Sequence, residues 1–313
     1  MNRRKFVKLS GAIAAGSFLS KTIFAKSKIE EVKMEYKSLN NGLKMPVLGF
    51  GTYLVNDPQS APDTVCQAIN SGFRLIDTAA GYGNEEFVGE GIRKSGVERS
   101  QLFIISKVWI KDASYSKLKS AFELSLKKLG TDYLDLYLIH QPYNDVYGAW
   151  RAMSELYKEG RIRAIGVSNF TPDRIADFAL CNEVVPALNQ IEANPFNQKW
   201  DAQKVNKEFG IQSQAWSPLC QGRRPDLLTN PVLVEIGKKH GKTPAQICLR
   251  WNIQRGFAAL VKTVHKERMS ENLNIFDFVL DGIDMEKISK LDERKAVIFE
   301  PTDPEKVKWL INM

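Results

Sequence analysis

The stretch FRLIDTAAGYGNEE, residues 73–86, opens with a short apolar run of the length typical of a buried strand. Asp77 stands where that strand is expected to end, a turn of small residues follows, and Tyr82 lies between two glycines. A helical pattern then runs from Asn84 to Lys94. A lone aspartate at the end of a strand is most often a turn residue, but core packing gives no reason for the nearby tyrosine. The stretch therefore predicts a strand, a loop that carries polar side chains, and a helix.

Two more apolar segments end on polar side chains in the same way. LFIISKVW, residues 102–109, predicts a strand that ends on Lys107, and LDLYLIHQP, residues 134–142, predicts one that ends on His140. A buried strand avoids a lysine unless the ammonium group has a partner. In a barrel of parallel strands the carboxyl ends lie on one face, so these side chains are expected to meet those of the first stretch.

Strand and helix patterns alternate along the rest of the chain. Eight strands and eight helices over roughly 250 residues are typical of a (β/α)8 or TIM barrel, an α/β fold. A hairpin with an Asn-Gly turn, residues 36–47, is expected to cover one end of the barrel. Two extra helices are expected at 244–254, before the eighth strand, and at 285–291. The strands are expected at 47–53, 74–77, 102–107, 134–140, 164–168, 187–192, 212–216 and 258–261, and the helices at 61–71, 84–94, 114–129, 146–159, 172–180, 202–209, 231–239 and 270–276.

These segments resemble the aldo-keto reductase family, and in particular bacterial reductases similar to diketogluconate reductase. The similarity extends over nearly all the chain from about Tyr36 onward. It includes GFGTY, IDTAAGYGNEE, SKVW, LDLYLIHQP, GVSNF, QIEANPF, AWSPL and ENLNIFDFVL. The resemblance implies a TIM barrel and a catalytic tetrad of Asp77, Tyr82, Lys107 and His140.

The resemblance also implies the reduction of an aldehyde or ketone to an alcohol with NADPH. Tyr82 is the expected general acid, and Lys107 is expected to lower the pKa of its phenol. Asp77 is expected to pair with Lys107, which limits the cost of burying the ammonium group. His140 is expected to hydrogen-bond the substrate oxygen and to orient it towards Tyr82.

The substrate is expected to bind between aromatic walls at the same face. Tyr53, Trp109 and His140 are the predicted substrate-binding residues, together with the loop 141–147 and the tail 296–313. Aromatic walls favour small carbonyl compounds with apolar or sugar-like bodies. The sequence leaves the particular aldehyde or ketone open.

The nicotinamide end of the cofactor is assigned by the same resemblance. Ser168, Asn169 and Gln190 correspond to residues that hydrogen-bond the carboxamide group. Trp216 corresponds to the aromatic residue that stacks on the ring. The alternatives are ordinary roles, namely a turn or helix cap for the Ser-Asn pair and core packing for the tryptophan. The residues expected to cover the pyrophosphate are Ser217, Leu219 and the loop 221–222.

The adenine end is expected at VKTVHKERMSENL, residues 261–273. Lys262 and Arg268 correspond to cations that grip the adenosine 2′-phosphate, with help from Thr263, which favours NADP(H) over NAD(H). The alternative is a solvated, charged start of a helix. Cys220 departs from the family pattern, since a glycine is usual at that place in the loop. The residues that correspond to adenine contacts are Glu271 and Asn272.

The first 28 residues read as a signal peptide. They have a charged start, an apolar middle and a plausible cleavage point at Ala25. The Arg3-Arg4 pair resembles the twin-arginine signal, whose export machinery transports folded proteins. We therefore expect a signal peptide at 1–28, a barrel domain at 29–313 and a periplasmic location. The alternative is a basic amphipathic extension on a cytoplasmic protein.

Charge and composition restrict the classes of partner. The net charge of +8 is concentrated at the start of the chain, because residues 1–25 hold five Lys or Arg side chains and no Asp or Glu. The rest of the chain carries 39 basic against 36 acidic side chains, which argues against a nucleic-acid partner. The expected partners are a carbonyl substrate and the export machinery, and nothing requires more than a monomer.

Several other classes of enzyme have no support in this sequence. The motifs of Rossmann dehydrogenases, P-loop enzymes, common serine hydrolases and zincins are all missing. The four cysteines lack metal-ligand spacing, so no metal is expected. Two readings remain beside the reductase: a non-catalytic NADP(H)-binding redox sensor, and an exported oxidoreductase that retains its cofactor.

Overall fold

The structure is a computed structural model that describes residues 34–313. The predicted signal peptide at 1–28 lies outside the described residues. Within 34–313, no helix is long and apolar enough to cross a membrane.

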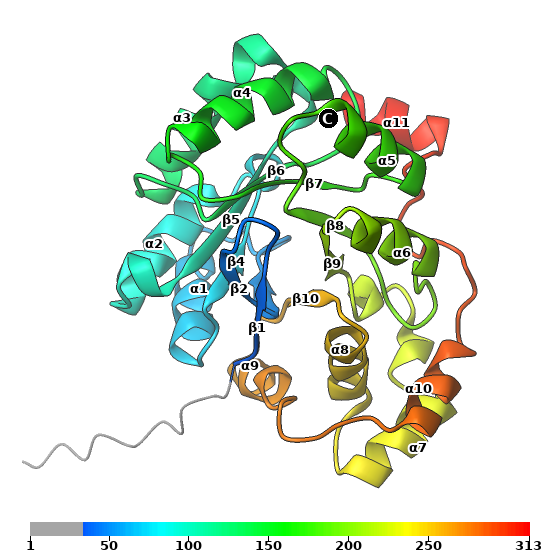
Figure 1. Ribbon diagram of the computed structural model, residues 1–313. Helices are drawn as coiled ribbons and strands as arrows, with labels where there is room; N and C mark the ends of the chain where they lie inside the picture. The colour runs from blue at the N-terminus through cyan, green and yellow to red at the C-terminus, as the bar shows by residue number, and fades with distance from the viewer. Residues whose placement is uncertain (1–33) are drawn as a thin grey trace, which may run out of the picture. The chain divides into compact units, whose positions relative to one another are not determined.

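Eight parallel strands close into a barrel at the centre of the described chain (Figure 1). Each strand pairs with its neighbours in sequence, and β10 closes the ring by pairing with both β9 and β3. The predicted TIM barrel is therefore confirmed. The strands are β3 (Leu48–Gly51), β4 (Leu75–Asp77), β5 (Phe103–Val108), β6 (Leu136–Ile139), β7 (Ile165–Ser168), β8 (Leu188–Glu192), β9 (Gln212–Trp216) and β10 (Ala258–Val261).

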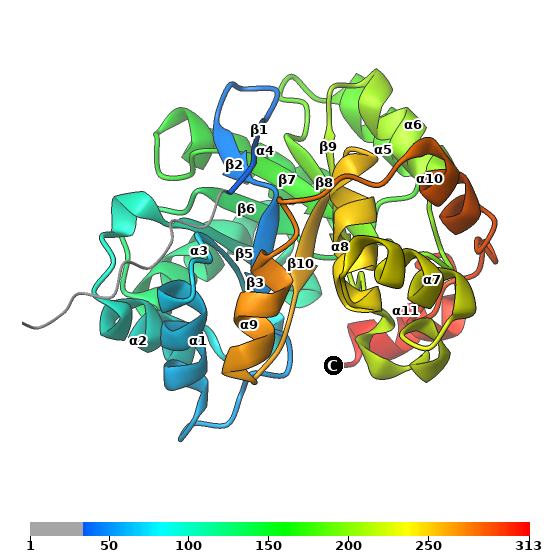
Figure 2. The same cartoon turned by 90° about the horizontal axis from the view of Figure 1, so that it is seen from below.

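Helices surround the barrel, as the two views at right angles show (Figures 1 and 2). Most of their buried side chains face the strands, in one large apolar layer between helices and barrel. The helices are α1 (Ala61–Asn70), α2 (Glu85–Ser95), α3 (Tyr115–Leu129), α4 (Val146–Lys158), α5 (Pro172–Cys181), α6 (Trp200–Glu208), α7 (Pro231–His240), α8 (Pro244–Gln254), α9 (Lys266–Leu273), α10 (Gly282–Ser289) and α11 (Pro304–Ile311).

One of the two extra helices is not the one predicted from sequence. α8 was expected to be extra, but it contacts β10 and α9 and therefore forms part of the ring. The extra helix is α7, which packs against α8 and α10 (Figure 2). Leu233 of α7, Trp251 of α8 and Ile288 of α10 share one buried apolar cluster. The sequence could not distinguish the two helices because both begin with a proline after a capping side chain.

Two helices differ from their predicted bounds by three residues or more, and one helix was not predicted. α9 ends at Leu273, since the chain leaves helical geometry at Asn274. α10 begins at Gly282, because Asp281 caps it in a reciprocal arrangement with Asp284. α11 was not predicted, although an aspartate that caps the helix and the proline that follows it are recognisable start signals.

The predicted hairpin closes the amino-terminal end of the barrel. It consists of β1 (Tyr36–Ser38) and β2 (Lys44–Pro46), which pair antiparallel. Leu39 and Met45 are buried with Leu75, Leu138 and other side chains inside the barrel. Full burial of such a side chain stabilises the fold by about 1.5–3 kcal/mol. With this end filled by apolar groups, the carboxyl ends of the strands are the place for polar chemistry.

Candidate active site

The four residues of the predicted tetrad come together at the carboxyl ends of the strands. Asp77 ends β4, Lys107 lies near the end of β5, His140 follows β6, and Tyr82 ends a short 3-10 turn after β4. The Lys107 Nζ lies 2.7 Å from Asp77 Oδ1, 2.9 Å from the Thr78 carbonyl oxygen and 3.4 Å from the Tyr82 hydroxyl. One ammonium group thus joins the carboxylate to the phenol.

Asp77 and Lys107 form a buried ion pair. Both side chains are almost fully enclosed, with 3% and 0% of their surface exposed. Burial raises the pKa of Asp77 and lowers the pKa of Lys107, while their mutual attraction acts in the opposite direction on each. Gln190 and the Thr78 carbonyl provide further hydrogen bonds to the pair. Removal of either partner would leave a buried charge without compensation.

The pKa of Tyr82 differs from the sequence-based expectation. Burial raises it well above the ordinary value, and the negative charge of Asp77 acts in the same direction. The net direction is therefore opposite to the lowering expected from Lys107. The ammonium lies closer to Asp77 than to the phenol, so the negative charge of Asp77 offsets part of its effect on Tyr82. The phenol is protonated at neutral pH.

His140 is buried and neutral. Burial lowers its pKa well below the ordinary value, and the positive charge of Lys107 adds to this effect. Its ring packs edge-on against Tyr82 and Trp109, with centroids 5.5 and 5.0 Å apart. The Nδ1 atom has no hydrogen-bond partner among residues 34–313. A neutral imidazole in this place can donate one hydrogen bond to a ligand beside Tyr82.

The predicted substrate-binding residues surround the phenol. The Tyr53 ring lies 5.1 Å from the Tyr82 ring, and Trp109 stands on the other side against His140. Next to Tyr53, Leu54 has a φ of 62° and is 62% exposed. An apolar side chain held exposed in the left-handed region is unusual, and no local sequence pattern predicts it.

Asn84 connects the two loops that carry Tyr53 and Tyr82. Its amide donates to the carbonyl oxygens of Thr52, at 2.8 Å, and Val55, at 3.0 Å, and it accepts from the Thr78 hydroxyl at 2.8 Å. Sequence reasoning treated Asn84 only as the start of a helix. Its side chain makes no capping hydrogen bond. Two of its three partners, Thr52 and Val55, lie far from Asn84 in the sequence, so the local pattern around Asn84 does not predict these contacts.

The residues predicted to hold the nicotinamide lie beside the tetrad and bond to one another. The Trp216 indole donates to Asn169 Oδ1 at 2.9 Å, and the Asn169 amide donates to the His140 carbonyl oxygen at 3.1 Å. The Ser168 hydroxyl donates to the Gln190 carbonyl oxygen at 2.9 Å. The structure therefore brings this whole predicted set to one side of the tetrad.

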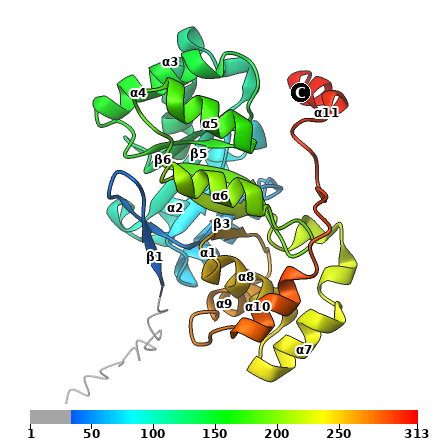
Figure 3. The same cartoon turned by 45° about the vertical axis from the view of Figure 1, so that its right-hand side comes forward.

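The carboxyl-terminal tail covers part of this region. Phe299 stacks on Trp216, with ring centroids 5.9 Å apart and an angle of 15° between the planes. The tail runs from α10 to α11 (Figure 3), and the buried Glu192 carboxylate accepts from the backbone N–H groups of Val297 and Ile298 at 2.7 and 3.1 Å. The tail was predicted near the mouth, but the anchoring by Glu192 was not.

An ion-pair cluster clamps the loop after β9 to the segment that leads into this tail. Ser217 and Leu219 begin this loop, and further along it the Arg224 guanidinium lies within 2.8 Å of Glu293 and 2.7 Å of Asp226. The same guanidinium lies over the Phe196 ring, 4.1 Å from its centroid. The segment predicted to cover the pyrophosphate is thus tied to the chain that leads into the tail.

The predicted adenine end forms an exposed cationic cluster at the carboxyl end of β10. Lys262 and Arg268 are exposed, and no carboxylate within residues 34–313 lies within ion-pair distance of either. The Thr263 hydroxyl accepts from the His265 N–H at 3.1 Å. Such unneutralised cations fit a phosphate dianion.

The two predicted adenine contacts lie on α9. The Glu271 carboxylate accepts from the Thr243 hydroxyl at 2.7 Å, and Asn272 is buried.

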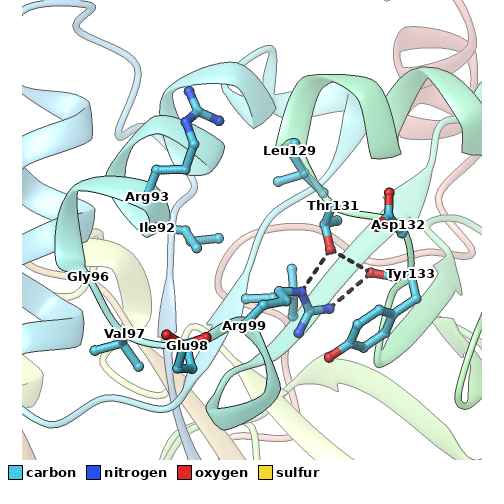
Figure 4. A pocket seen from close by; sticks show the side chains of 12 residues that line it. Ile92, Arg93, Gly96, Val97, Glu98, Arg99, Leu129, Thr131, Asp132 and Tyr133 are labelled. Carbon is cyan, nitrogen blue, oxygen red and sulfur yellow. Dashed lines mark hydrogen bonds between the residues drawn. The ribbon is translucent and has the colours of Figure 1, made fainter.

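A hollow of about 390 Å³ lies elsewhere, between the carboxyl ends of α2 and α3 (Figure 4). Arg99 crosses it and donates to the Thr131 hydroxyl at 2.9 Å and the Tyr133 carbonyl oxygen at 3.0 Å, as the dashed lines in the figure mark. It also pairs with the buried Asp135 at 2.8 Å. The guanidinium is therefore satisfied by the protein, and the hollow is separate from the tetrad. No group of metal-ligating side chains gathers within 34–313.

The chain is similar to known proteins over most of its length. A family model described as "Aldo/keto reductase family" matches residues 47–293. The chain is 47% identical over 260 residues to the glyoxal reductase of Bacillus subtilis, which covers 83% of this chain and 93% of that protein. It is 40% identical over 279 residues to the morphine 6-dehydrogenase of Pseudomonas putida, with coverage of 85% and 94%.

Solved structures share the fold over nearly the same length. An aldo-keto reductase from a Medee basin deep-sea metagenome library has a TM-score of 0.83 at 38% identity, covering 85% of this chain and 98% of that one. The Bombyx mori aldo-keto reductase in complex with NADP has a TM-score of 0.81 at 32% identity, with coverage of 88% and 96%.

Proposed function

Because the chain belongs to the aldo/keto reductase family, we propose that it is an NADPH-dependent reductase that converts aldehydes or ketones to alcohols. The observation that carries the proposal is the contact of a protonated Tyr82 with Lys107, beside a neutral His140. A binding module without catalysis has no need for these three groups together.

The proposed roles follow from the state of each group. NADPH, when bound, supplies the hydride that adds to the carbonyl carbon. The Tyr82 hydroxyl gives its proton to the carbonyl oxygen, and Lys107 stabilises the phenolate that remains until solvent returns a proton. Neutral His140 donates a hydrogen bond to the same oxygen and orients it. Asp77 holds Lys107 in place.

The choice of NADP(H) over NAD(H) rests on the cationic cluster. Lys262 and Arg268 would hold the 2′-phosphate, with Thr263 beside them, and Glu271 and Asn272 would lie near the adenine. The proposal is supported by the silkworm relative, whose structure contains NADP. Trp216 would present to the nicotinamide the face that Phe299 does not cover.

The aromatic wall of Tyr53 and Trp109 favours carbonyl compounds that bring apolar surface to the mouth. The relatives are named for substrates of very different size, glyoxal and morphine. We therefore propose a broad substrate range, with glyoxal as a suitable first probe.

The test is NADPH oxidation by the full chain with glyoxal, compared with Tyr82→Phe. We expect a loss of about 100-fold or more in kcat, because a positioned acid contributes roughly 10²–10⁴-fold. NADPH binding, measured by quenching of tryptophan fluorescence, should be unchanged. Tight NADPH binding without turnover in either protein would favour the redox-sensor reading instead.

A second candidate is an exported oxidoreductase that keeps one cofactor, which a second substrate re-reduces after each turnover. The clamp between Arg224 and Glu293 favours it, because this ion pair ties down the loop proposed to cover the pyrophosphate. The leader with Arg3-Arg4 is the sequence basis for export. Native protein purified from the periplasmic fraction should then contain nucleotide, whereas protein without nucleotide, found only in the cytoplasm, would contradict this candidate.

A further inference from the structure

Gln214 is a fully buried polar residue in the barrel interior. The resemblance to the family assigns no role to it. It lies on β9, two residues before Trp216, and pairs in register with Gln190 on β8. Interior positions of such barrels are mostly filled by branched apolar side chains. A glutamine at this place therefore calls for an explanation.

The Gln214 side chain fixes the amide of Gln190. The Gln190 Nε2 donates to Asp77 Oδ2 at 2.8 Å and to Gln214 Oε1 at 2.9 Å. An amide nitrogen has two hydrogens, so both are used. Two acceptors in different directions determine the plane of the amide as well as which end is nitrogen. Within residues 34–313, no donor bonds to the remaining atom, Gln190 Oε1.

The arrangement has a cost that packing does not explain. The Gln214 Nε2 is buried and has no acceptor among the described residues. An unsatisfied buried donor destabilises a fold, so an apolar side chain of similar size would suit the core better. The contact with Gln190 is the one hydrogen bond that the Gln214 side chain makes within 34–313.

We propose that Gln214 is a positioning residue of the reductase. It holds the Gln190 amide so that Oε1 faces the nicotinamide and accepts a hydrogen bond from the carboxamide NH2 group. Without Gln214, the amide can rotate about its remaining bond to Asp77, and the acceptor moves out of line. This inference rests on the proposed function.

The experiment uses a cofactor that lacks the donor. In 3-acetylpyridine adenine dinucleotide phosphate, reduced form, a methyl group replaces the carboxamide NH2. Wild type, Gln214→Met, Gln214→Leu and Gln190→Met are compared with both cofactors, measuring cofactor Kd and kcat. Two variants at position 214 guard against a failure of one to fold. The matched control is Gln198→Met, which removes a fully buried glutamine whose amide donates to Pro195 and Ile288 carbonyl oxygens at 2.8 Å, away from the tetrad.

With NADPH, both Gln214 variants should raise the Kd about fivefold or more and lower kcat. With the acetylpyridine cofactor, the difference in Kd from wild type should fall below twofold, as it should for Gln190→Met. The control Gln198→Met should be less stable, but its Kd should not change differently for the two cofactors. An equal increase in Kd for both cofactors, or an increase for neither, would overturn the role of Gln214. Failure of the wild type to bind NADPH would instead contradict the proposed function.

Discussion

Gln190 on β8 donates a hydrogen bond of 2.8 Å to Asp77 on β4, a residue 113 positions earlier in the chain. Since Asp77 also pairs with Lys107, this bond connects the residues predicted to hold the nicotinamide to the proposed acid. Binding at one end of the site and proton delivery at the other are therefore not independent. Substitutions of Gln190 or Asp77 should therefore affect both cofactor binding and proton delivery.

Lys107→Met should abolish reduction and destabilise the protein. The variant leaves Asp77 buried without its cation, and breaking a buried pair costs about 3–5 kcal/mol. Urea unfolding should show this as a lower free energy of unfolding. The control is Lys290→Met, which removes an exposed pair with Glu286 and should cost less than about 1 kcal/mol. Equal stability of Lys107→Met and wild type would contradict the buried ion pair.

The rate of reduction should remain constant as the pH rises through the neutral range. The acid must be protonated, and burial raises the pKa of Tyr82 well above the ordinary value of ~10. The rate of hydride transfer, measured in single turnover, should therefore show no decline between about pH 7 and pH 9. A decline centred near pH 7 would mean that bound NADPH lowers the pKa of Tyr82 strongly.

Stability should decrease as the pH falls through the ordinary histidine range. The pKa of His140 is lowered in the folded state, so below ~6.5 the unfolded chain binds a proton that the folded chain does not. The slope from this residue approaches about 1.4 kcal/mol per pH unit below that value. His140→Asn should unfold with a flatter dependence between pH 7 and pH 5. The same slope in both proteins would mean that His140 accepts a proton in the folded state.

Arg224→Gln should accelerate the release of NADPH. The substitution removes the ion pairs with Glu293 and Asp226 that clamp the loop after β9. Stopped-flow measurement of NADPH fluorescence, with excess NADP+ as a trap, should give a dissociation rate several-fold higher. Lys287→Gln, which breaks an exposed pair with Glu235, is the control and should not change it. An unchanged rate in Arg224→Gln would mean that the loop opens without breaking this clamp.

Arg268→Ala should weaken NADPH more than NADH. A hydrogen bond to a charged group is worth about 1.5–3 kcal/mol, which corresponds to roughly a 10- to 150-fold change in Kd. Binding of NADH, which lacks the 2′-phosphate, should change little. Equal losses for the two cofactors would remove the argument for a phosphate site at β10.

Local sequence patterns were sufficient for the barrel and for the meeting of the strand-end residues at one face. Each strand and helix has its own local pattern, and in a parallel barrel the carboxyl ends of all strands must lie on one face. Asp77, Lys107 and His140 at successive strand ends therefore had to converge, whatever the details of packing. The hairpin at 36–47 was also readable, because an Asn-Gly pair between two extended runs is a local turn signal.

Contacts across the barrel were decided only by the tertiary structure. Local patterns do not say that Gln214 on β9 and Asp77 on β4 share the Gln190 amide, because that depends on closure of the ring and on the direction of each side chain. They also could not say that α7, and not α8, lies outside the ring. Local patterns also do not predict the pKa of Tyr82, because it depends on burial and on the distances from Lys107 to Asp77 and to the phenol. Sequence determines which groups reach the mouth of the barrel, and three-dimensional distance and burial determine their charge state.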